Sequence, residues 1–467
     1  MQPIIDFLLP IVQKINEYMS DYILIFLLIG TGIFYTIRTR FVQVRCFGQG
    51  MKKVFGNLSL KGGKQKSGLS SFQALATAIA AQVGTGNIVG ACGAILIGGP
   101  GAIFWMWIIA FFGMATIYAE AVLAQETKVQ NPDGSVLGGP VYYIKRAFNN
   151  PFGKFLAGFF AVAITLALGF MGSMVQSNSI AESTNTAFAI PGWVIGLVLA
   201  GICAVIFIGG IQRIASVAEK IVPIMAVIYL VMGLVILCIN VQKLPESFAM
   251  IFKFAFNPDA LLGAGIGASI KFAISQGVKR GLFSNEAGMG STPHAHAQAN
   301  VEKSHDQGVV AMVGVFIDTF VVLTMTALVV ISTLYAGGGV LGTQAGLAAN
   351  SAITKANMMQ TAVGQAFGNA NVGNILVAVC LAFFAFTTII SWNFFGKQNV
   401  QYLFGKKATV VYSILAIGFI FLGTLFPNDL VWELADMFNN IMVIPNAIAL
   451  LALSGIVVAA AKTKRKK

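Results

Sequence analysis

Charged side chains are scarce in this chain, which limits what it can be. Only 10% of its 467 residues are Asp, Glu, Lys or Arg, whereas 57% are hydrophobic. This composition is the reverse of that of a soluble enzyme, so it indicates an all-α polytopic membrane protein that forms one membrane domain. The net charge of +13 would suggest a nucleic-acid partner in a soluble protein, but here its placement along the chain matters more, and no such partner is expected.

Cysteine and histidine are also sparse. The five cysteines lie far apart without a CxxC pair, so we interpret them as small core residues. The histidines His294, His296 and His305 sit close in sequence, but His-x-His without further ligands does not predict a metal site. No metal or organic cofactor is expected apart from a coupling ion.

Catalytic motifs are missing as well. The chain has no HExxH, GxSxG or Walker sequence and no Asp pair at a helix midpoint, which argues against a membrane-embedded enzyme. An amino-acid sensor built on a transporter scaffold is an alternative, but sensors usually carry a soluble output domain and none is evident.

What the chain does have is long apolar segments. Eleven are predicted as spans, at about 19–37, 70–97, 102–125, 154–183, 192–210, 217–239, 260–279, 308–335, 372–396, 408–426 and 437–461. If the N-terminus is outside, the inner loops and the C-terminal tail hold 25 of the 30 basic residues. The spacing therefore predicts eleven spans in the cell membrane with the C-terminus in the cytoplasm.

The same pattern divides the chain into parts. We expect an interfacial helix at 1–18, kinked at Pro10, and an extra span at 19–40. The remaining ten spans form two sets of five that enter the membrane from opposite sides, as in an inverted repeat. The predicted boundaries are 41–69 for a basic cytoplasmic loop, 70–240 and 241–461 for the two five-helix repeats, and 462–467 for a basic tail.

One apolar segment contains residues that disfavour a continuous helix. Gly84, Thr85, Gly86 and Asn87 lie near the middle of the segment 70–97, where helix propensity is poor and polar groups are costly. We expect a break that exposes backbone groups to a buried polar cavity, although close packing of small residues would also explain the pattern. The matching segment of the second repeat is rich in glycine, at Gly263, Gly265, Gly267 and Gly277, and predicts a second break.

Four stretches resemble a known family. They are Val83 to Gly90, Gly98 to Trp107, Gly138 to Ile144, and Arg280 to Ser291, and together they are similar to the alanine or glycine:cation symporters over nearly the whole chain. The resemblance implies a LeuT-type fold and uptake of small neutral amino acids, chiefly alanine or glycine, coupled to Na⁺ or H⁺. The oligomeric state stays open, and a monomer is compatible with the sequence.

The resemblance also implies a substrate site. In the family's fold the amino-acid carboxylate meets backbone N–H groups at the first break, which here would be those of Thr85, Gly86 and Asn87. The ammonium would meet backbone carbonyls of the second break, near Ser269 to Ile274. The predicted lining from this second segment is Ser269, Phe272, Ala273, Ile274 and Gly277.

A sodium site is implied in the same way. It would combine the carbonyls of Ala80 and Val83 with the hydroxyls of Thr387 and Thr388, because Na⁺ prefers hard oxygen ligands. Hydroxyls in membrane helices also bond back to their own backbone, so the two threonines need not bind an ion.

Other side chains are candidates for the pocket wall. Gln176 could bind substrate or the broken helix, or serve as a hydrogen bond between helices. Trp392 and Phe170 could keep the pocket small, although Phe170 is more simply explained by ordinary packing.

Four charges complete the predictions. Lys271 and Asp318 are placed deepest and are expected to pair, with a cation-site role for Lys271 and proton coupling by Asp318 as alternatives. Arg280 and Glu286 are expected to form a pair at the cytoplasmic mouth, unless that loop is static. Proton-coupled transport of other small substrates is the main alternative function.

Overall fold

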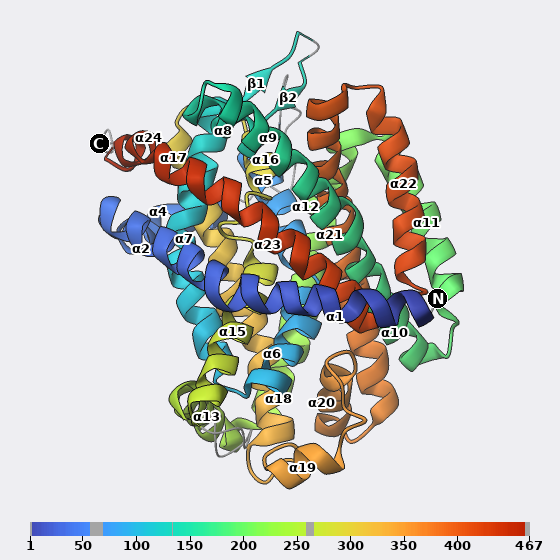
Figure 1. The fold of residues 1–467 in the computed structure, drawn as a ribbon. Helices are drawn as coiled ribbons and strands as arrows, with labels where there is room; N and C mark the ends of the chain where they lie inside the picture. The colour runs from blue at the N-terminus through green and yellow to red at the C-terminus, as the bar shows by residue number, and fades with distance from the viewer. Residues whose placement is uncertain (1, 57–68, 133, 258–265, 463–467) are drawn as a thin grey trace.

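The computed structural model describes residues 2–56, 69–132, 134–257 and 266–462. Within these ranges the chain is mostly helical, with one short antiparallel hairpin formed by β1 (Val129–Gln130) and β2 (Val136–Leu137). The helices pack into one bundle with a shared apolar core (Figure 1). The predicted all-α class is therefore confirmed, with this small hairpin as an addition.

The N-terminal part is one long helix rather than two separate ones. α1 (Gln2–Tyr18) continues through the π-helical segment η1 (Met19–Leu24) into α2 (Ile25–Arg38), and Pro10 lies inside α1 without ending it. No break marks the predicted boundary near residue 18 in this described helix, so where each part lies in the bilayer stays a prediction. α3 (Val42–Arg45) and α4 (Phe47–Phe55) follow.

The first half then begins at a well-capped helix. Ser70 Oγ accepts the backbone N–H of Gln73, and Gln73 Oε1 accepts that of Ser70, which fixes the start of the next helix. The elements of this half are α5 (Ser71–Gln82), η2 (Gly86–Gly90), α6 (Ala91–Gly98), α7 (Ala102–Thr127), α8 (Pro140–Ala147), α9 (Pro151–Ile164), η3 (Thr165–Gly172), α10 (Ser173–Phe188), α11 (Gly192–Ile208) and α12 (Gly210–Ile239).

The second half has a similar helical content. Its elements are η4 (Val241–Lys243), α13 (Leu244–Phe256), α15 (Ile266–Asn285), α16 (Pro293–Ala297), α17 (Ser304–Val315), η5 (Phe316–Leu323), α18 (Thr324–Val330), η6 (Ile331–Tyr335), α19 (Gln344–Ala349), α20 (Met358–Ala366), α21 (Ala370–Phe404), α22 (Ala408–Gly423), α23 (Asn428–Ala452) and α24 (Ser454–Ala461).

Long apolar helices dominate both halves. Among the described residues, seven helices are long and apolar enough to cross a membrane, or up to eight if the bent pair of α5 and η2–α6 is one span. α11 and α22, at two further predicted spans, are apolar but shorter. The chain is thus a multi-pass membrane protein, while the number of eleven and the inverted repeat stay predictions.

Two predicted spans have wrong boundaries, because charged residues within their helices were taken to mark loops. The span predicted at 260–279 continues through Lys279 and Arg280 to the end of α15, and the one predicted at 437–461 starts earlier, so that α23 includes Asp436. Lys279 Nζ and Arg280 Nη2 each lie 3.0 Å from Asp436 Oδ2. Because these charges neutralise one another inside the protein, the helices continue where the sequence pattern predicted a loop.

Candidate functional site

The predicted first break is present. α5 ends at Gln82, Val83 leaves the helical region with φ −81° and ψ 87°, and the chain resumes at Gly86 after a bend of 47° between the two arms. Gly84, Thr85 and their neighbours are buried, so the backbone groups freed at the bend face protein rather than lipid. We call Val83 to Asn87 the first interruption.

Two side-chain amides hold the freed N–H groups. The N–H of Gly84 donates to Asn87 Oδ1 at 3.0 Å, and the N–H of Thr85 donates to Gln176 Oε1 of α10 at 3.1 Å. The hydroxyl of Thr85 is buried and has no hydrogen-bond partner among the described residues. Gln176, predicted as a pocket residue, therefore lies directly at the interruption.

Part of the predicted sodium set also meets here. Thr388 Oγ1 of α21 is 2.9 Å from the carbonyl oxygen of Ala80 and 3.1 Å from that of Phe384. Thr387 instead bonds to the carbonyl of Phe384 at 2.9 Å, with its hydroxyl 3.7 Å from the sulfur of Met225. The structure thus brings Ala80 and Thr388 together next to Gly84, while Thr387 faces α12.

The described part of the segment predicted to hold the second break, from Ile266 on, has no break. α15 is continuous from Ile266 to Asn285, so the carbonyls near Ser269 to Ile274 belong to a regular helix. The prediction that these residues form an open main-chain site is wrong. Gly263 and Gly265 lie outside the described residues, and so does the side chain of Ser269.

Packing explains two of the glycines within α15, Gly277 and Gly281. A Cβ on Gly277 would lie 2.5 Å from the Cβ of Trp105, and one on Gly281 would lie 2.6 Å from Ile109 Cγ2, so both let α15 approach α7 closely. Ala273 is fully buried against Gly98, whereas Phe272 is 46% exposed. Ile274 is partly buried against the core, so this segment contributes to helix packing, and contact of its side chains with a substrate stays a prediction.

The interruption in the second half comes later, after α15. Glu286, Gly288 and Gly290 have φ values of 58°, 93° and 79°, a left-handed conformation that ends the helix, and the short helix α16 follows. We call Glu286 to Thr292 the second interruption. All of it except Thr292 falls within the stretch Arg280 to Ser291, which was placed at the cytoplasmic mouth, and these residues are buried in the bundle.

The end of α15 touches the first interruption. A Cβ on Gly86 would lie 3.0 Å from Ser284 Cα and 3.2 Å from Phe283 Cδ1. Asp318 of η5 bridges the two: Asn87 Nδ2 donates to its Oδ1 at 2.6 Å, and Ser284 Oγ donates to its carboxylate at 3.0 and 3.1 Å. The first interruption and the end of α15, from which the second interruption starts, therefore meet around one buried carboxylate, and we call this place the meeting point of the interruptions.

Asp318 does not pair with Lys271 as predicted. Lys271 and Ser284, the partner of Asp318, are thirteen positions apart on one helix, which is about 20 Å along the axis and beyond the reach of a lysine side chain. Lys271 Nζ instead lies 5.1 Å from the centre of the Tyr22 ring. The predicted pairing is wrong because the predicted ends of the helices, and hence the predicted depths of Lys271 and Asp318 in the membrane, were wrong.

The predicted pair of Arg280 and Glu286 is also wrong. Arg280 binds Asp436 and stacks on Trp432, with its guanidinium carbon 4.7 Å from the ring centre. Glu286 Oε1 accepts the indole N–H of Trp392 at 2.6 Å, and its Oε2 accepts the hydroxyl of Ser291. Glu286 thus links the second interruption to α21.

The two aromatic wall candidates behave differently. Trp392 is buried and packs edge-to-face on Phe283 with 5.8 Å between ring centres, so it lies where the interruptions meet. Phe170 stacks on Phe419 at 4.6 Å and packs near Tyr412, an ordinary aromatic cluster on α22. The packing explanation for Phe170 is therefore sufficient.

Glu120 of α7 is a site residue that the sequence analysis missed. Its two carboxylate oxygens accept the N–H groups of Gly290 at 2.9 Å and Gly288 at 3.1 Å, and Asn446 Nδ2 donates to it at 2.7 Å. Glu120 is fully buried and holds the backbone of the second interruption. A lone carboxylate deep in an apolar segment was the signal that could have found it.

The histidines take part in ordinary hydrogen bonds. His294 Nδ1 is 2.7 Å from the carbonyl oxygen of Ser291, and His305 Nδ1 is 2.7 Å from the hydroxyl of Tyr118. In the part of the chain that the structure describes, no three His, Cys, Asp or Glu side chains are placed to hold a metal ion.

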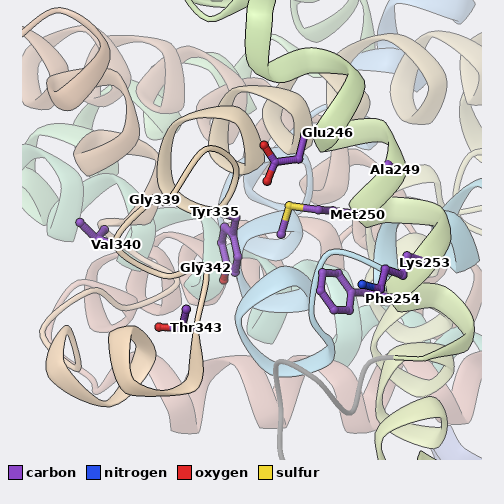
Figure 2. Close-up of a pocket in the computed structure, with 11 residues that line it drawn as sticks. Glu246, Ala249, Met250, Lys253, Phe254, Tyr335, Gly339, Val340, Gly342 and Thr343 are labelled. Atoms are coloured by element: carbon purple, nitrogen blue, oxygen red, sulfur yellow. The ribbon is translucent and has the colours of Figure 1, made fainter.

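A separate cavity of about 630 Å³ lies between α13 and the loop that follows η6 (Figure 2). Glu246 of α13 borders it and accepts the N–H of Gly337 at 2.9 Å. Its described lining includes none of the predicted site residues, so it is distinct from the meeting point of the interruptions.

A bent, partly unwound helix inside a multi-span bundle, with buried polar side chains at the bend, is how secondary transporters form their sites. The fold and the site therefore define a membrane transport protein. The sequence profile of the Sodium:alanine symporter family matches residues 5–467, and the chain belongs to that family. The family is made up of symporters, not enzymes.

Individual relatives agree with this assignment. The chain is 40% identical over 453 residues to the sodium/alanine symporter AgcS of Methanococcus maripaludis, covering 97% of this chain and 96% of the relative. It is 38% identical over 449 residues to an uncharacterized transporter of Haemophilus influenzae, covering 96% and 94%. It is also 38% identical over 471 residues to the "Probable sodium/glutamine symporter GlnT" of Bacillus subtilis, covering 100% and 92%.

Among solved structures, the fold is similar to that of the manganese transporter of Eremococcus coleocola. The TM-score is 0.52 at 13% identity, with 87% of this chain and 82% of that chain covered. At this identity the likeness establishes a shared fold and nothing about the substrate.

Proposed function

We propose that this protein is a Na⁺-coupled symporter of small neutral amino acids, chiefly alanine and glycine, working by alternating access around the two interruptions. The observation that carries this proposal is the first interruption itself. The N–H groups of Gly84 and Thr85, which could bind an anion, lie there. Close to them, the carbonyl oxygen of Ala80 and the hydroxyl oxygen of Thr388 are 2.9 Å apart and could bind a cation.

The substrate carboxylate would replace neutral acceptors. The N–H groups of Gly84 and Thr85 now donate to the amide oxygens of Asn87 and Gln176. A carboxylate is a stronger acceptor than an amide, and each charge-assisted bond contributes about 1.5–3 kcal/mol. The exchange displaces only the two amide oxygens, because the side-chain nitrogen of Asn87 already donates to Asp318.

The substrate ammonium needs acceptors on the opposite side. With α15 continuous, we assign this role to the meeting point around Ser284 and Asp318 instead of the carbonyls near Ser269. Asp318 is buried, and its carboxylate already accepts from Asn87 of the first interruption. A small zwitterion that spans the two interruptions would therefore find partners for both of its charges.

The ion site is proposed at Ala80, Val83 and Thr388. Carbonyl and hydroxyl oxygens suit a hard monovalent cation, and Thr388 joins α21 to the end of α5. An ion there would hold the interruption against α21, so ion binding and substrate binding would stabilise the same local arrangement. Thr387 is the weaker candidate because its hydroxyl faces Met225.

The aromatic side chains at the proposed site favour a small substrate. Trp392 and Phe283 wall the meeting point, and Trp392 is fixed by its hydrogen bond to Glu286. Bulk of this kind excludes large side chains by sterics, whereas the absence of one methyl group costs only about 1–3 kcal/mol, so alanine and glycine can share the site. The glutamine named for one relative makes glutamine the competing substrate to test.

Orientation follows from charge. The loops and tail predicted to be cytoplasmic hold 25 of the 30 basic residues when the N-terminus is outside, and we propose this arrangement, with the C-terminus in the cytoplasm of the cell.

The test is uptake of labelled alanine, glycine and glutamine by the purified protein in liposomes. An inward Na⁺ gradient should drive accumulation of alanine and glycine, and collapsing that gradient should stop it. Accumulation of glutamine alone, or none with any Na⁺ gradient, would contradict the proposal.

Proton coupling is the second candidate, and Asp318 is the observation that favours it. A carboxylate buried between the two interruptions could carry a proton instead of leaving the coupling to Na⁺. Uptake driven by a pH gradient in the absence of Na⁺ would select this candidate.

A further inference from the structure

A second cavity, of about 240 Å³, lies next to the first interruption. It is formed by η2 and α6 on one side, α15 and α23 on the other, and Lys355 from the loop between α19 and α20. Gly90 and Trp432 both line it, and Trp432 packs on Phe283 with 4.8 Å between ring centres. Phe283 contacts the position of Gly86, so these two rings separate the cavity from the meeting point of the interruptions.

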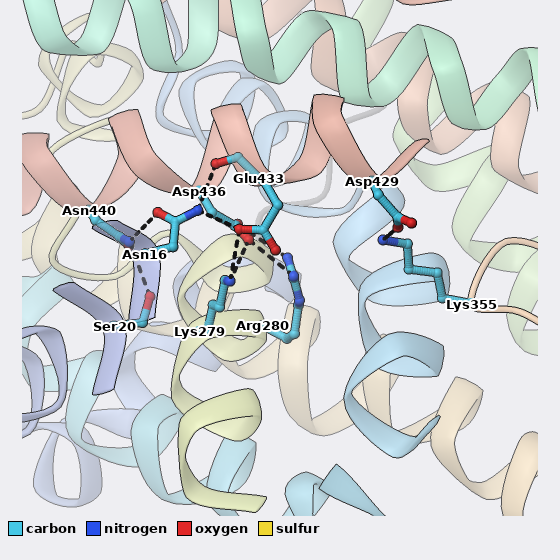
Figure 3. A network of polar contacts seen from close by, with 9 residues as sticks. All are labelled: Asn16, Ser20, Lys279, Arg280, Lys355, Asp429, Glu433, Asp436 and Asn440. Carbon is cyan, nitrogen blue, oxygen red and sulfur yellow. Dashed lines mark hydrogen bonds and ion pairs between the residues drawn. The ribbon is translucent and has the colours of Figure 1, made fainter. Parts of the chain in front are cut away.

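The cavity has charges of both signs on its walls (Figure 3). On one side, Lys279 and Arg280 bind Asp436, and Glu433 lies 3.9 Å from Lys279 Nζ. On the other side, Lys355 Nζ is 3.0 Å from Asp429 Oδ1. A ligand between these two clusters would have a cation and a carboxylate available from each.

Lys355 is held deep in this wall. Its Nζ lies 5.4 Å from the centre of the Trp432 ring, and the guanidinium carbon of Arg280 lies 4.7 Å from the same centre. A Cβ on Gly93 would lie 3.5 Å from the Lys355 Cβ, so the lysine side chain packs against α6 at this position. Burial lowers the pKa of Lys355, which fits a side chain withdrawn from water.

Two buried polar atoms of the lining lack partners. The indole N–H of Trp432 and the side-chain oxygen of Gln276 have no hydrogen-bond partner within the described ranges. One is a donor and the other an acceptor. Buried polar groups are normally hydrogen-bonded, so this pair indicates a ligand that both accepts and donates.

We propose that this cavity is a second, weaker binding site for a free small amino acid, occupied before the substrate passes Phe283 and Trp432. The carboxylate accepts from Lys355 and the Trp432 indole, and the ammonium donates to Asp429 and Gln276. The ligand class rests on the proposed function, since the zwitterion is the transported amino acid.

Physical chemistry favours such a weak site. The wall charges are already paired, so an incoming zwitterion exchanges ion-pair partners and leaves no charge unpaired on binding or on release. A cavity of about 240 Å³ also admits only small ligands. The distribution of basic residues among the predicted loops places Lys355 in an outer loop. This site therefore faces the side from which substrate arrives.

The first test is alanine uptake by Lys355→Gln and Asp429→Asn, with Lys253→Gln as the control. Lys253 lies on α13 in the same predicted outer layer and does not line the cavity. We expect KM for alanine to rise about ten-fold in the two cavity variants, with Vmax and the Na⁺ dependence kept, because one charge-assisted bond is lost. An unchanged KM in both variants would overturn the inference.

The second test separates this site from the central one. Ile97→Cys, in the lining of the cavity but with no assigned contact to the ligand, is labelled with a charged thiol reagent in Na⁺-free buffer, where coupled binding at the interruption is weak, and alanine is added at millimolar concentration. Alanine should slow labelling at Ile97→Cys and leave Lys253→Cys unaffected. Equal rates with and without alanine, in a protein that transports alanine, would refute the second site alone; a protein without alanine transport would refute the proposed function.

Discussion

The side-chain nitrogen of Asn87 lies 2.6 Å from a carboxylate oxygen of Asp318, which ties the first interruption to the helix run that follows α17. Ser284, at the end of α15, donates to the same carboxylate. One buried carboxylate therefore holds together the first interruption, the end of α15 and η5. If any one of these segments moves, it either breaks these hydrogen bonds or moves together with the other two.

Replacing Asp318 with asparagine should lower the maximal rate of alanine uptake by at least about ten-fold, because an amide is a weaker acceptor than a carboxylate for Asn87 and Ser284. The Na⁺ requirement should persist. Initial rates in liposomes across a range of external pH values provide the measurement. If the variant loses only its pH dependence and keeps its rate, Asp318 serves proton coupling instead.

Thr388→Ala should raise the Na⁺ concentration for half-maximal uptake by about ten-fold, equivalent to about 1.4 kcal/mol of ion binding. The reason is the loss of the hydroxyl that sits 2.9 Å from the Ala80 carbonyl. Thr388→Ser should retain near-normal Na⁺ dependence, and Thr387→Ala serves as the matched neighbour that faces Met225. Equal effects of the two alanine variants would rule out the assignment to Thr388.

Gly84→Ala should abolish or strongly reduce transport while the protein is still produced. An added Cβ would collide with Thr388 Oγ1 and come within 3.0 Å of Gln176 Oε1. Overpacking of this kind costs about 1–3 kcal/mol, here at the point where substrate and ion meet. Gly418→Ala, at a position with nothing within 4 Å, is the control. Normal uptake by Gly84→Ala would show that the site has more room than the structure indicates.

Glu120→Ala should loosen the second interruption, because the N–H groups of Gly288 and Gly290 lose their acceptors at about 1–3 kcal/mol each. Thermal unfolding of the purified protein should shift to lower temperature, and Vmax should fall. Glu120→Gln keeps one acceptor oxygen and should recover part of both. A destabilisation without any effect on uptake would make Glu120 purely structural.

Trp392→Ala should broaden the substrates to include serine, valine or leucine, since the ring walls the meeting point beside Phe283. Trp392→Phe keeps much of the bulk but loses the hydrogen bond to Glu286, so it should slow transport without broadening it. Competition of each amino acid against labelled alanine measures the difference. Broadening by both variants, or by neither, would count against a role in size selection.

The sequence predicted the first interruption correctly because its cause is local. Gly84, Thr85, Gly86 and Asn87 have poor helix propensity, and a backbone break inside an apolar segment needs polar partners. Gln176 was found for the same reason, as an amide in the middle of an apolar segment. Its bond to the N–H of Thr85 is what the structure adds.

The second interruption was missed because glycine has two uses. Gly277 and Gly281 allow α15 to pack closely on α7, while Gly288 and Gly290 adopt positive φ and end the helix. Composition does not separate these uses. Partners such as Asp318 with Asn87, or Arg280 with Asp436, depend on helix ends and on contacts across more than 100 residues, which an apolar pattern does not encode.

The N-terminal helix has a practical consequence. Asn16 of α1 donates to Glu433 of α23 at 2.6 Å, and Asn440 of α23 donates to Asn16 at 3.2 Å and to Ser20 at 3.1 Å (Figure 3). α1 runs alongside α23 and is joined to it by these hydrogen bonds (Figure 1). A fluorophore placed near the amino terminus would therefore move together with α23. The fluorescence of such a label would report movements of α23 during transport, and the label would leave every residue proposed to bind substrate or ion unchanged.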